Sequence, residues 1–180
     1  LNQFRKILPE KNNLGISLEY KEQTKPAGLP EAFTIGEKFI GKDNVSLILG
    51  DNFFYGQSLT KILKKSINLK TGAKIFIHPV KNPNLYGVAT LNENKNVIKL
   101  IEKPKKTNSN FAVTGLYFFD NEVIKFTKKL KPSKRNELEI VDLLKKYKNK
   151  NKLNSQFLGR GGAWLDTGSI KDFYDTSAFV

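Results

Sequence analysis

The fold is indicated most strongly by the stretch Val45-Ser46-Leu47-Ile48-Leu49-Gly50-Asp51-Asn52. A short apolar run closed by a glycine and an acid is typical of a central parallel strand that is buried on both faces. An amphipathic helical pattern at residues 59–67 and a second apolar run at residues 73–80 follow, so the three segments predict a βαβ unit. Ligands of open α/β sheets bind where such strands end, which makes Asp51 a candidate site residue.

The rest of the chain predicts further strands and helices around this unit. We expect strands at residues 16–20, 87–91, 97–101, 112–119, 153–158 and 163–168. We expect helices at residues 1–8 and 30–39, from residues 122 and 138, and after Ser169, whose spacing to Asp172 is that of an N-cap with an acidic partner. Residues 1–180 are therefore predicted to form a single α/β domain with a mixed, mostly parallel, Rossmann-like sheet flanked by helices.

The composition argues against several classes of protein. No apolar run approaches the roughly 20 residues that cross a bilayer, so we expect a soluble, cytoplasmic protein without a membrane partner. The net charge of +14 suggests nucleic acid, but arginine occurs only three times, the lysines are scattered, and no recognised nucleic-acid motif is present. The absence of cysteine excludes disulfides and thiolate metal sites, and the absence of a nucleophile motif argues against a hydrolase.

Two aspartates have the sequence context of a magnesium site. Asp51 and Asp166 each end a short apolar run, and Mg²⁺ at phosphoryl-transfer sites takes one or two carboxylates besides water and substrate phosphates. For Asp51 alone, a cap of the following turn is an equally good interpretation. The presence of a second acid, Asp166, in the same context favours the interpretation as a metal site.

The end of the strand at residues 97–101 presents an acid and a base together. Glu102 can accept hydrogen bonds from sugar hydroxyls, and Lys103 can bind a phosphate as a point charge. By itself this pair is more simply interpreted as a solvated ion pair. Gly87, directly after Tyr86, can offer a bare backbone amide to a ligand, whereas His78 has no ligand-spaced partner and is predicted to be structural.

Six motifs, taken in order, closely resemble those of the glucose-1-phosphate thymidylyltransferases, and the resemblance covers essentially the whole chain. They are Leu49-Gly50-Asp51-Asn52-Phe53-Phe54-Tyr55-Gly56, Tyr86-Gly87-Val88, Ile101-Glu102-Lys103-Pro104, Val113-Thr114-Gly115-Leu116-Tyr117-Phe118-Phe119-Asp120, Arg135-Asn136-Glu137-Leu138-Glu139-Ile140 and Ala163-Trp164-Leu165-Asp166-Thr167-Gly168.

The resemblance implies a reaction and a set of roles. The reaction joins dTTP and glucose 1-phosphate to give dTDP-glucose and pyrophosphate, for dTDP-rhamnose and polysaccharide biosynthesis, in a homotetramer. The implied catalytic residues are Asp51 and Asp166, which hold Mg²⁺, and Lys103, which holds the phosphate. The implied binding residues are Gln23 and Gly28 at the base, Gly87, Glu102, Lys103 and Val113 in the sugar-phosphate pocket, and Tyr86, Trp164 and Arg135 in support.

The sequence also departs from this family. The opening motif G-G-x-G-T-R-L and its downstream lysine are not found, and the chain contains no methionine. We therefore expect an N-terminally truncated fragment that lacks the first β-α segment and is inactive alone. Val141 stands where the family commonly has threonine. The alternatives are an enzyme that uses UTP or another sugar 1-phosphate, and a non-catalytic module that binds sugar nucleotides.

Overall fold

The computed structural model describes residues 2–159 and 161–179, so Leu1 of the first predicted helix lies outside the described residues. The helices are α1 (Asn2–Ile7), α2 (Glu31–Ile35), α3 (Glu37–Ile40), α4 (Leu59–Ile67), α5 (Glu122–Thr127), α6 (Ile140–Asn149), α7 (Ile170–Phe179) and the 3-10 helix η1 (Pro83–Leu85). The strands are β1 (Val45–Ile48), β2 (Asn52–Tyr55), β3 (Ala73–Pro79), β4 (Gly87–Leu91), β5 (Val97–Glu102), β6 (Phe111–Phe119), β7 (Leu153–Phe157) and β8 (Ala163–Asp166).

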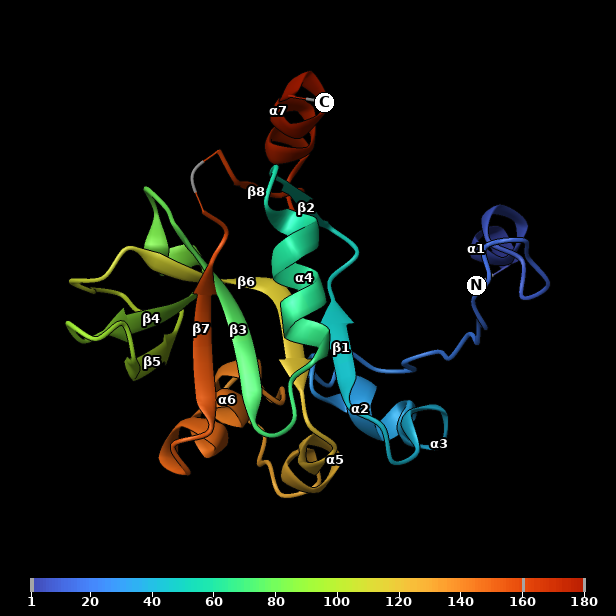
Figure 1. Cartoon of the computed structure of the whole chain (residues 1–180), viewed down its shortest axis with the longest axis horizontal. Helices are drawn as coiled ribbons and strands as arrows, with labels where there is room; N and C mark the ends of the chain where they lie inside the picture. Colours follow the sequence, from blue (N-terminus) through green and yellow to red (C-terminus); the bar gives the residue numbers. More distant parts are fainter. Residues whose placement is uncertain (1, 160, 180) are drawn as a thin grey trace.

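Strand β6 is the centre of the main sheet (Figure 1). It pairs antiparallel with β3 along one edge and with β4 and β1 along the other. β5 pairs antiparallel with β4, while β7 pairs parallel with β3. The sheet is an α/β mixed sheet but mostly antiparallel, so the expectation of a mostly parallel sheet is wrong. β1 and β3 do run in the same direction, as the βαβ pattern predicts, but β6 from later in the chain lies between them.

The burial of strand β1, at residues 45–48, differs from its prediction. β1 pairs with β6 and, among the described residues, with no second strand, and its side chains alternate between half-buried and exposed. Val45 and Leu47 pack against the core, whereas Ile48 is 60% exposed. The predicted burial of both faces is therefore wrong for β1. It is confirmed for β3, in which Ile75, Phe76 and Ile77 are fully buried.

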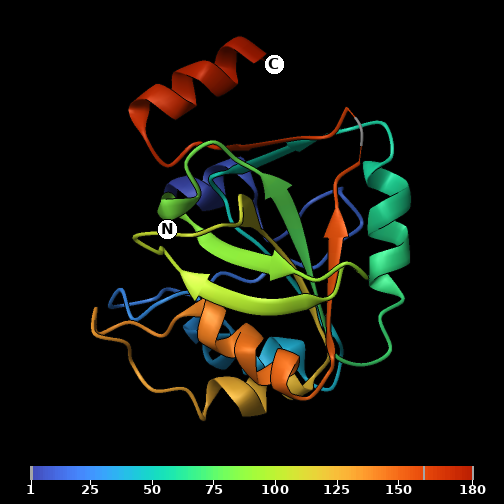
Figure 2. The ribbon, with the colours of Figure 1, turned by 90° about the vertical axis from the view of Figure 1, so that its left-hand side faces the viewer.

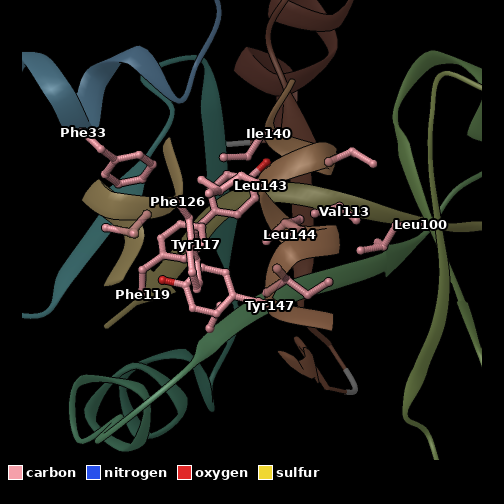
Figure 3. Packing of buried hydrophobic residues seen from close by; sticks show 14 of the residues in the cluster. Phe33, Leu100, Val113, Tyr117, Phe119, Phe126, Ile140, Leu143, Leu144 and Tyr147 are labelled. Carbon is pink, nitrogen blue, oxygen red and sulfur yellow. The ribbon is translucent and has the colours of Figure 1, made fainter. Parts of the chain in front are cut away.

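Two hydrophobic cores lie on opposite faces of the sheet because successive strand residues point to opposite sides. Ile75 and Ile77 belong to the larger core, while Phe76 between them belongs to the smaller one. The larger core packs the sheet against α2, α5 and α6, and Figure 3 shows Phe119 and Tyr147 close together within it. The smaller core packs against α4, which Figures 1 and 2 show apart from α5 and α6.

Several local predictions are corrected as well. Residues 16–20 form no strand, and the helix predicted at residues 30–39 is divided at Gly36 into α2 and α3. Residues Asn52–Tyr55, expected to lie beyond a strand end, form β2 and pair antiparallel with β8 in a two-stranded ribbon. The predicted cap is present, since Ser169 Oγ donates to Asp172 Oδ2 at 2.5 Å and accepts from Asp172 N at 3.1 Å.

The two terminal helices are the least buried. α1 has no buried residue and stands apart from the sheet in Figure 1, and α7 exposes Ile170 and Tyr174. Across the described residues, no helix combines the length and the apolar character required to span a membrane.

Candidate functional site

A cavity of about 260 Å³ opens where β4, β5 and β6 meet the start of α6. Its lining includes many of the residues singled out from the sequence, namely Tyr86, Gly87, Glu102, Lys103, Val113, Arg135 and Asp166. These residues come from distant parts of the chain, so the fold brings together what the motifs predicted. Asp51, Gln23, Gly28 and Trp164 lie around the cavity rather than in its lining.

Gly87 allows the cavity wall to close tightly. It is paired with Glu102 in the β4–β5 ladder, and a Cβ at this position would lie 2.8 Å from Val141 Cγ2 and 3.3 Å from Glu102 Oε2. No side chain fits there without moving a neighbour. Val141 is fully buried and gives this wall an apolar methyl surface, where the resembled family commonly has a hydroxyl.

Lys103 leaves the line of strand β5 through an unusual backbone conformation. The φ of Lys103 is 38°, in the left-handed region that residues other than glycine rarely adopt, and Pro104 follows Lys103. Its N–H donates to the carbonyl of Tyr86 at 3.0 Å, which closes the strand end. Local strain of this kind is characteristic of functional positions, and here it accompanies a lysine side chain that lines the cavity.

The Arg135 network, made of Ser133, Arg135, Glu102 and Glu139, forms one wall. Arg135 Nη2 and Nε donate to the two carboxylate oxygens of Glu139 at 2.7 and 3.1 Å, and Ser133 Oγ donates to Glu139 at 2.6 Å. Glu102 Oε1 lies 3.8 Å from Arg135 Nη2. Burial raises the pKa of Glu139, but hydrogen bonds from Arg135 and Ser133 outweigh it and lower the pKa overall. The pKa of Glu102 is raised, first by burial and then by the charge of Glu139.

Tyr117 and Glu139 line this site but were not singled out from the sequence. Tyr117 lies four residues after Val113 on the same face of β6, and burial raises its pKa. Figure 3 shows the side chains of Val113 and Tyr117 in the packing around the sheet. Glu139 accepts two hydrogen bonds from Arg135, but residues 135–139 form a turn and not a helix, so the spacing of the two residues does not by itself predict this pair.

The aspartate pair, Asp51 and Asp166, lies at the other side of the cavity. The ribbon brings the two together, since Asn52 pairs with Asp166 and both N–H and Oγ1 of Thr167 donate to the carbonyl of Asp51 at 2.8 Å. The pKa of Asp166 is raised by burial and, to a lesser extent, by the charge of Asp51. Within residues 2–159 and 161–179, no lysine or arginine forms an ion pair with either carboxylate.

This donor set fits a hard divalent cation. Two neighbouring carboxylates without an ion-pair partner repel each other, and a cation between them relieves that repulsion. The described residues contain no group of three or more potential metal-ligating side chains, so water and substrate oxygens would complete the coordination.

Trp164 supports the site from behind. Its Nε1 donates to Asn52 Oδ1 at 2.6 Å, and its ring makes edge contacts with Tyr86 at 5.1 Å and His78 at 6.3 Å between centroids. Burial lowers the pKa of His78, so this side chain is neutral near pH 7 and packs as a structural residue.

The loop that carries Gln23 and Gly28 is docked against the cavity wall. Gly28 has a φ of 102°, and a Cβ there would lie 2.2 Å from the carbonyl oxygen of Leu138, a lining residue. Leu138 N donates to the carbonyl of Ala27 at 2.8 Å. Gln23 Nε2 donates to the carbonyl of Gly28 at 3.2 Å and to Glu31 at 2.6 Å, and the Gln23 side chain is exposed.

Comparison with known proteins assigns the chain to one family and finds relatives within it. The sequence model of the nucleotidyl transferase family matches residues 2–180. The chain is 49% identical over 98% of its length to the glucose-1-phosphate thymidylyltransferase of Neisseria meningitidis, and 44% identical over 98% to that of Mycolicibacterium smegmatis. It covers 62% and 61% of those two proteins, so it spans about three fifths of the length of the curated relatives that it matches.

Solved structures agree with this result. A Bacillus anthracis protein assigned as a glucose-1-phosphate thymidylyltransferase, solved with sucrose, superposes with a TM-score of 0.88 at 34% identity, covering 99% of this chain and 71% of that one. A UDP-glucose pyrophosphorylase in complex with UDP-glucose superposes with a TM-score of 0.75 at 24% identity, covering 89% and 64%, which shows a shared fold.

Proposed function

Because this chain belongs to the nucleotidyl transferase family, we propose that the protein transfers a thymidylyl group from dTTP to glucose 1-phosphate, giving dTDP-glucose and pyrophosphate. One observation carries the proposal: an aspartate pair that has no ion-pair partner among the described residues lies beside a cavity that also presents Lys103 and Glu102. The combination suits a ligand that is a polyol at one end and a phosphate at the other.

The cavity would hold the sugar phosphate. Its volume of about 260 Å³ is slightly below the roughly 300–1,000 Å³ of drug-sized ligand sites, so it suits a single hexose with its phosphate near the opening. Glu102 would accept hydrogen bonds from sugar hydroxyls, beside the bare backbone of Gly87. Lys103 would bind the phosphate, and Val113 and Val141 would contact the apolar face of the ring. Arg135 would act through Glu102, whose carboxylate lies 3.8 Å from its Nη2.

The reaction is a single displacement at phosphorus. An oxygen of the sugar phosphate attacks the α-phosphorus of dTTP, a new P–O bond forms, and the bond to the bridging oxygen breaks with its electron pair leaving on pyrophosphate. The chain's contribution is positioning and charge neutralisation, with Lys103 holding the attacking phosphate in line. Asp51 and Asp166 would hold Mg²⁺, which when bound neutralises charge on the nucleotide phosphates.

The loop with Gln23 and Gly28 would contact the thymine base, because it closes the cavity next to Leu29 and Leu138. The carbonyl of Gly28 and the amide of Gln23 are already joined there by a hydrogen bond. The homo-oligomer and the cytoplasmic location expected from the resemblance remain predictions.

The test is pyrophosphate release by the full-length protein with glucose 1-phosphate, Mg²⁺ and either dTTP or UTP. We expect turnover that requires Mg²⁺ and favours dTTP. A preference for UTP would assign the protein to the uridylyl-transferring relatives. Tight binding of dTDP-glucose with no turnover from either nucleotide would instead identify a binding module.

A further inference from the structure

We propose that Asn52 is a positioning residue that fixes the carboxylate of Asp51 relative to that of Asp166. The inference rests on the proposed function, because it assigns Asn52 a role in orienting the two carboxylates that would hold the divalent cation. It concerns a side chain that lies behind the site, not one that touches the substrate.

Both ends of the Asn52 amide are used. Nδ2 donates to Asp51 Oδ1 at 2.8 Å, and Oδ1 accepts from Trp164 Nε1 at 2.6 Å and from Gly115 N at 2.8 Å. Indole and backbone N–H groups only donate, so the oxygen must face them and the NH₂ group must face Asp51. The orientation of the amide is therefore determined by its partners.

The amide is anchored on the central strand of the sheet. A Cβ at Gly115 would lie 2.5 Å from Asn52 Oδ1 and 2.8 Å from Leu49 Cγ, so β6 has a glycine where the asparagine side chain enters. The neighbours Thr114 and Leu116 are buried. Asn52 thus links Asp51, which is itself exposed, to a buried strand and fixes its position relative to that strand.

Asn52 is also the residue at which the two acidic segments meet. Its backbone pairs with Asp166 in the ribbon, while its side chain contacts Asp51 and Trp164. Thr167 holds only the carbonyl of Asp51. Among the described residues, the one side-chain or backbone donor to the Asp51 carboxylate is Asn52, so its loss would free that carboxylate to rotate.

Two variants of the full-length protein separate positioning from folding. Asn52→Asp keeps an acceptor for Trp164 and Gly115 but replaces the donor to Asp51 with a like charge. Asn52→Ala removes all three bonds and adds no charge. Asn92→Asp is the matched control, because Asn92 uses only its oxygen, accepting from Asn96 N at 2.9 Å in the β4–β5 turn, and the variant adds the same charge.

Two measurements are made well below the melting temperature of each variant. The first is turnover of dTTP and glucose 1-phosphate against Mg²⁺ concentration. The second is binding of Mn²⁺ alone, followed by electron paramagnetic resonance. We expect Asn52→Asp to lower kcat about tenfold or more, and Asn52→Ala to weaken Mn²⁺ binding by a similar factor, because supporting partners of metal ligands commonly have effects of that size. Asn92→Asp should match the wild type in both.

Wild-type kcat in Asn52→Asp together with wild-type Mn²⁺ affinity in Asn52→Ala would overturn the inference and leave Asn52 a purely structural residue. The proposed function fails separately, through absence of turnover in the wild-type protein. In that case the Mn²⁺ affinities of wild type and Asn52→Ala still decide whether Asn52 positions the aspartate pair.

Discussion

On one wall of the cavity, the Arg135 network pairs its charges internally; on the other, the aspartate pair has no cationic partner among the described residues. The pKa values of Glu139 and Asp166 reflect this difference, while that of Glu102, which lies 3.8 Å from Arg135 Nη2, is raised by burial and by the charge of Glu139. That of Glu139 is lowered although the side chain is buried, because Arg135 and Ser133 donate to it. That of Asp166 is raised by burial and by Asp51.

The contrast shows how one small cavity can have a rigid wall of paired charges and, under the proposed function, a second wall that would bind a cation. A paired acid stabilises the fold and fixes the shape of its wall. An acid that is partly buried beside a second acid destabilises the fold, and such sites often lose stability in exchange for function. We therefore expect substitutions in the aspartate pair to lower activity but not stability. Substitutions in the Arg135 network should mainly lower stability.

The largest effect should come from Asp166→Asn. We expect turnover to fall about a hundredfold or more, because under the proposed function this carboxylate would hold the cation at the transferring phosphate. The melting temperature should stay the same or rise, since a partly buried, repelled carboxylate becomes neutral. Pyrophosphate release and thermal unfolding measure the two quantities. A clear drop in melting temperature would mean that the N–H of Gly168, which donates to Asp166 Oδ1 at 3.1 Å, stabilises the carboxylate more than burial and Asp51 destabilise it, and the contrast between the walls would disappear.

Arg135→Ala should have the next largest effect, and mainly on stability. The substitution leaves Glu139 buried without the two hydrogen bonds that Arg135 donates. Glu102 and Glu139 then repel each other. Because Arg135 is half exposed, we expect a loss of about 1–2 kcal/mol in the free energy of unfolding, less than for a fully buried pair. Chemical denaturation measures it. Arg135→Lys is the control, which keeps the charge and loses the two-pronged geometry, and should fall in between.

The smallest effect is the pH dependence of the Arg135 network. The folded-state pKa of Glu139 is below the ordinary 4.5, so its stabilising contribution is present above that value and is lost as pH falls through the folded-state pKa. Glu139→Gln should therefore be less stable than the wild type at pH 7, by up to about 1 kcal/mol, and the difference should shrink below the ordinary pKa. Denaturant titrations from pH 7 to pH 3 test this; a constant gap would show that the carboxylate charge contributes nothing.

The sequence predicts the elements of this fold better than their arrangement. β3, β4 and β6 are found where their apolar patterns indicate, but pattern alone does not distinguish a buried parallel strand from a buried antiparallel one. The decisive feature is that β6 lies between β1 and β3, and no local signal reports an insertion from so far along the chain. The burial of β1 cannot be predicted from its own residues for the same reason, because it depends on which strands pair with β1.

The candidate site shows the same division. Glu102, Lys103 and Asp166 were identified because each stands at a strand end, where the local pattern places ligand-binding side chains. Asn52 was not identified as a site residue, since its significance depends on Trp164, a partner 112 positions away. The functional roles of all these residues remain predictions, whereas the meeting of Glu102, Lys103 and Asp166 at one cavity is a structural fact.

The position of β6 has a consequence for the order in which the chain assembles. Both β1 and β3 use β6 as their antiparallel partner, so neither can complete its ladder until residues 111–119 are available. While the residues before Phe111 leave the ribosome, these strands have unpaired edges, and such edges invite pairing with other chains. Closing the ladder late adds contacts between distant residues, which slows folding. A chaperone that shields nascent chains would therefore be expected to matter most before β6 emerges.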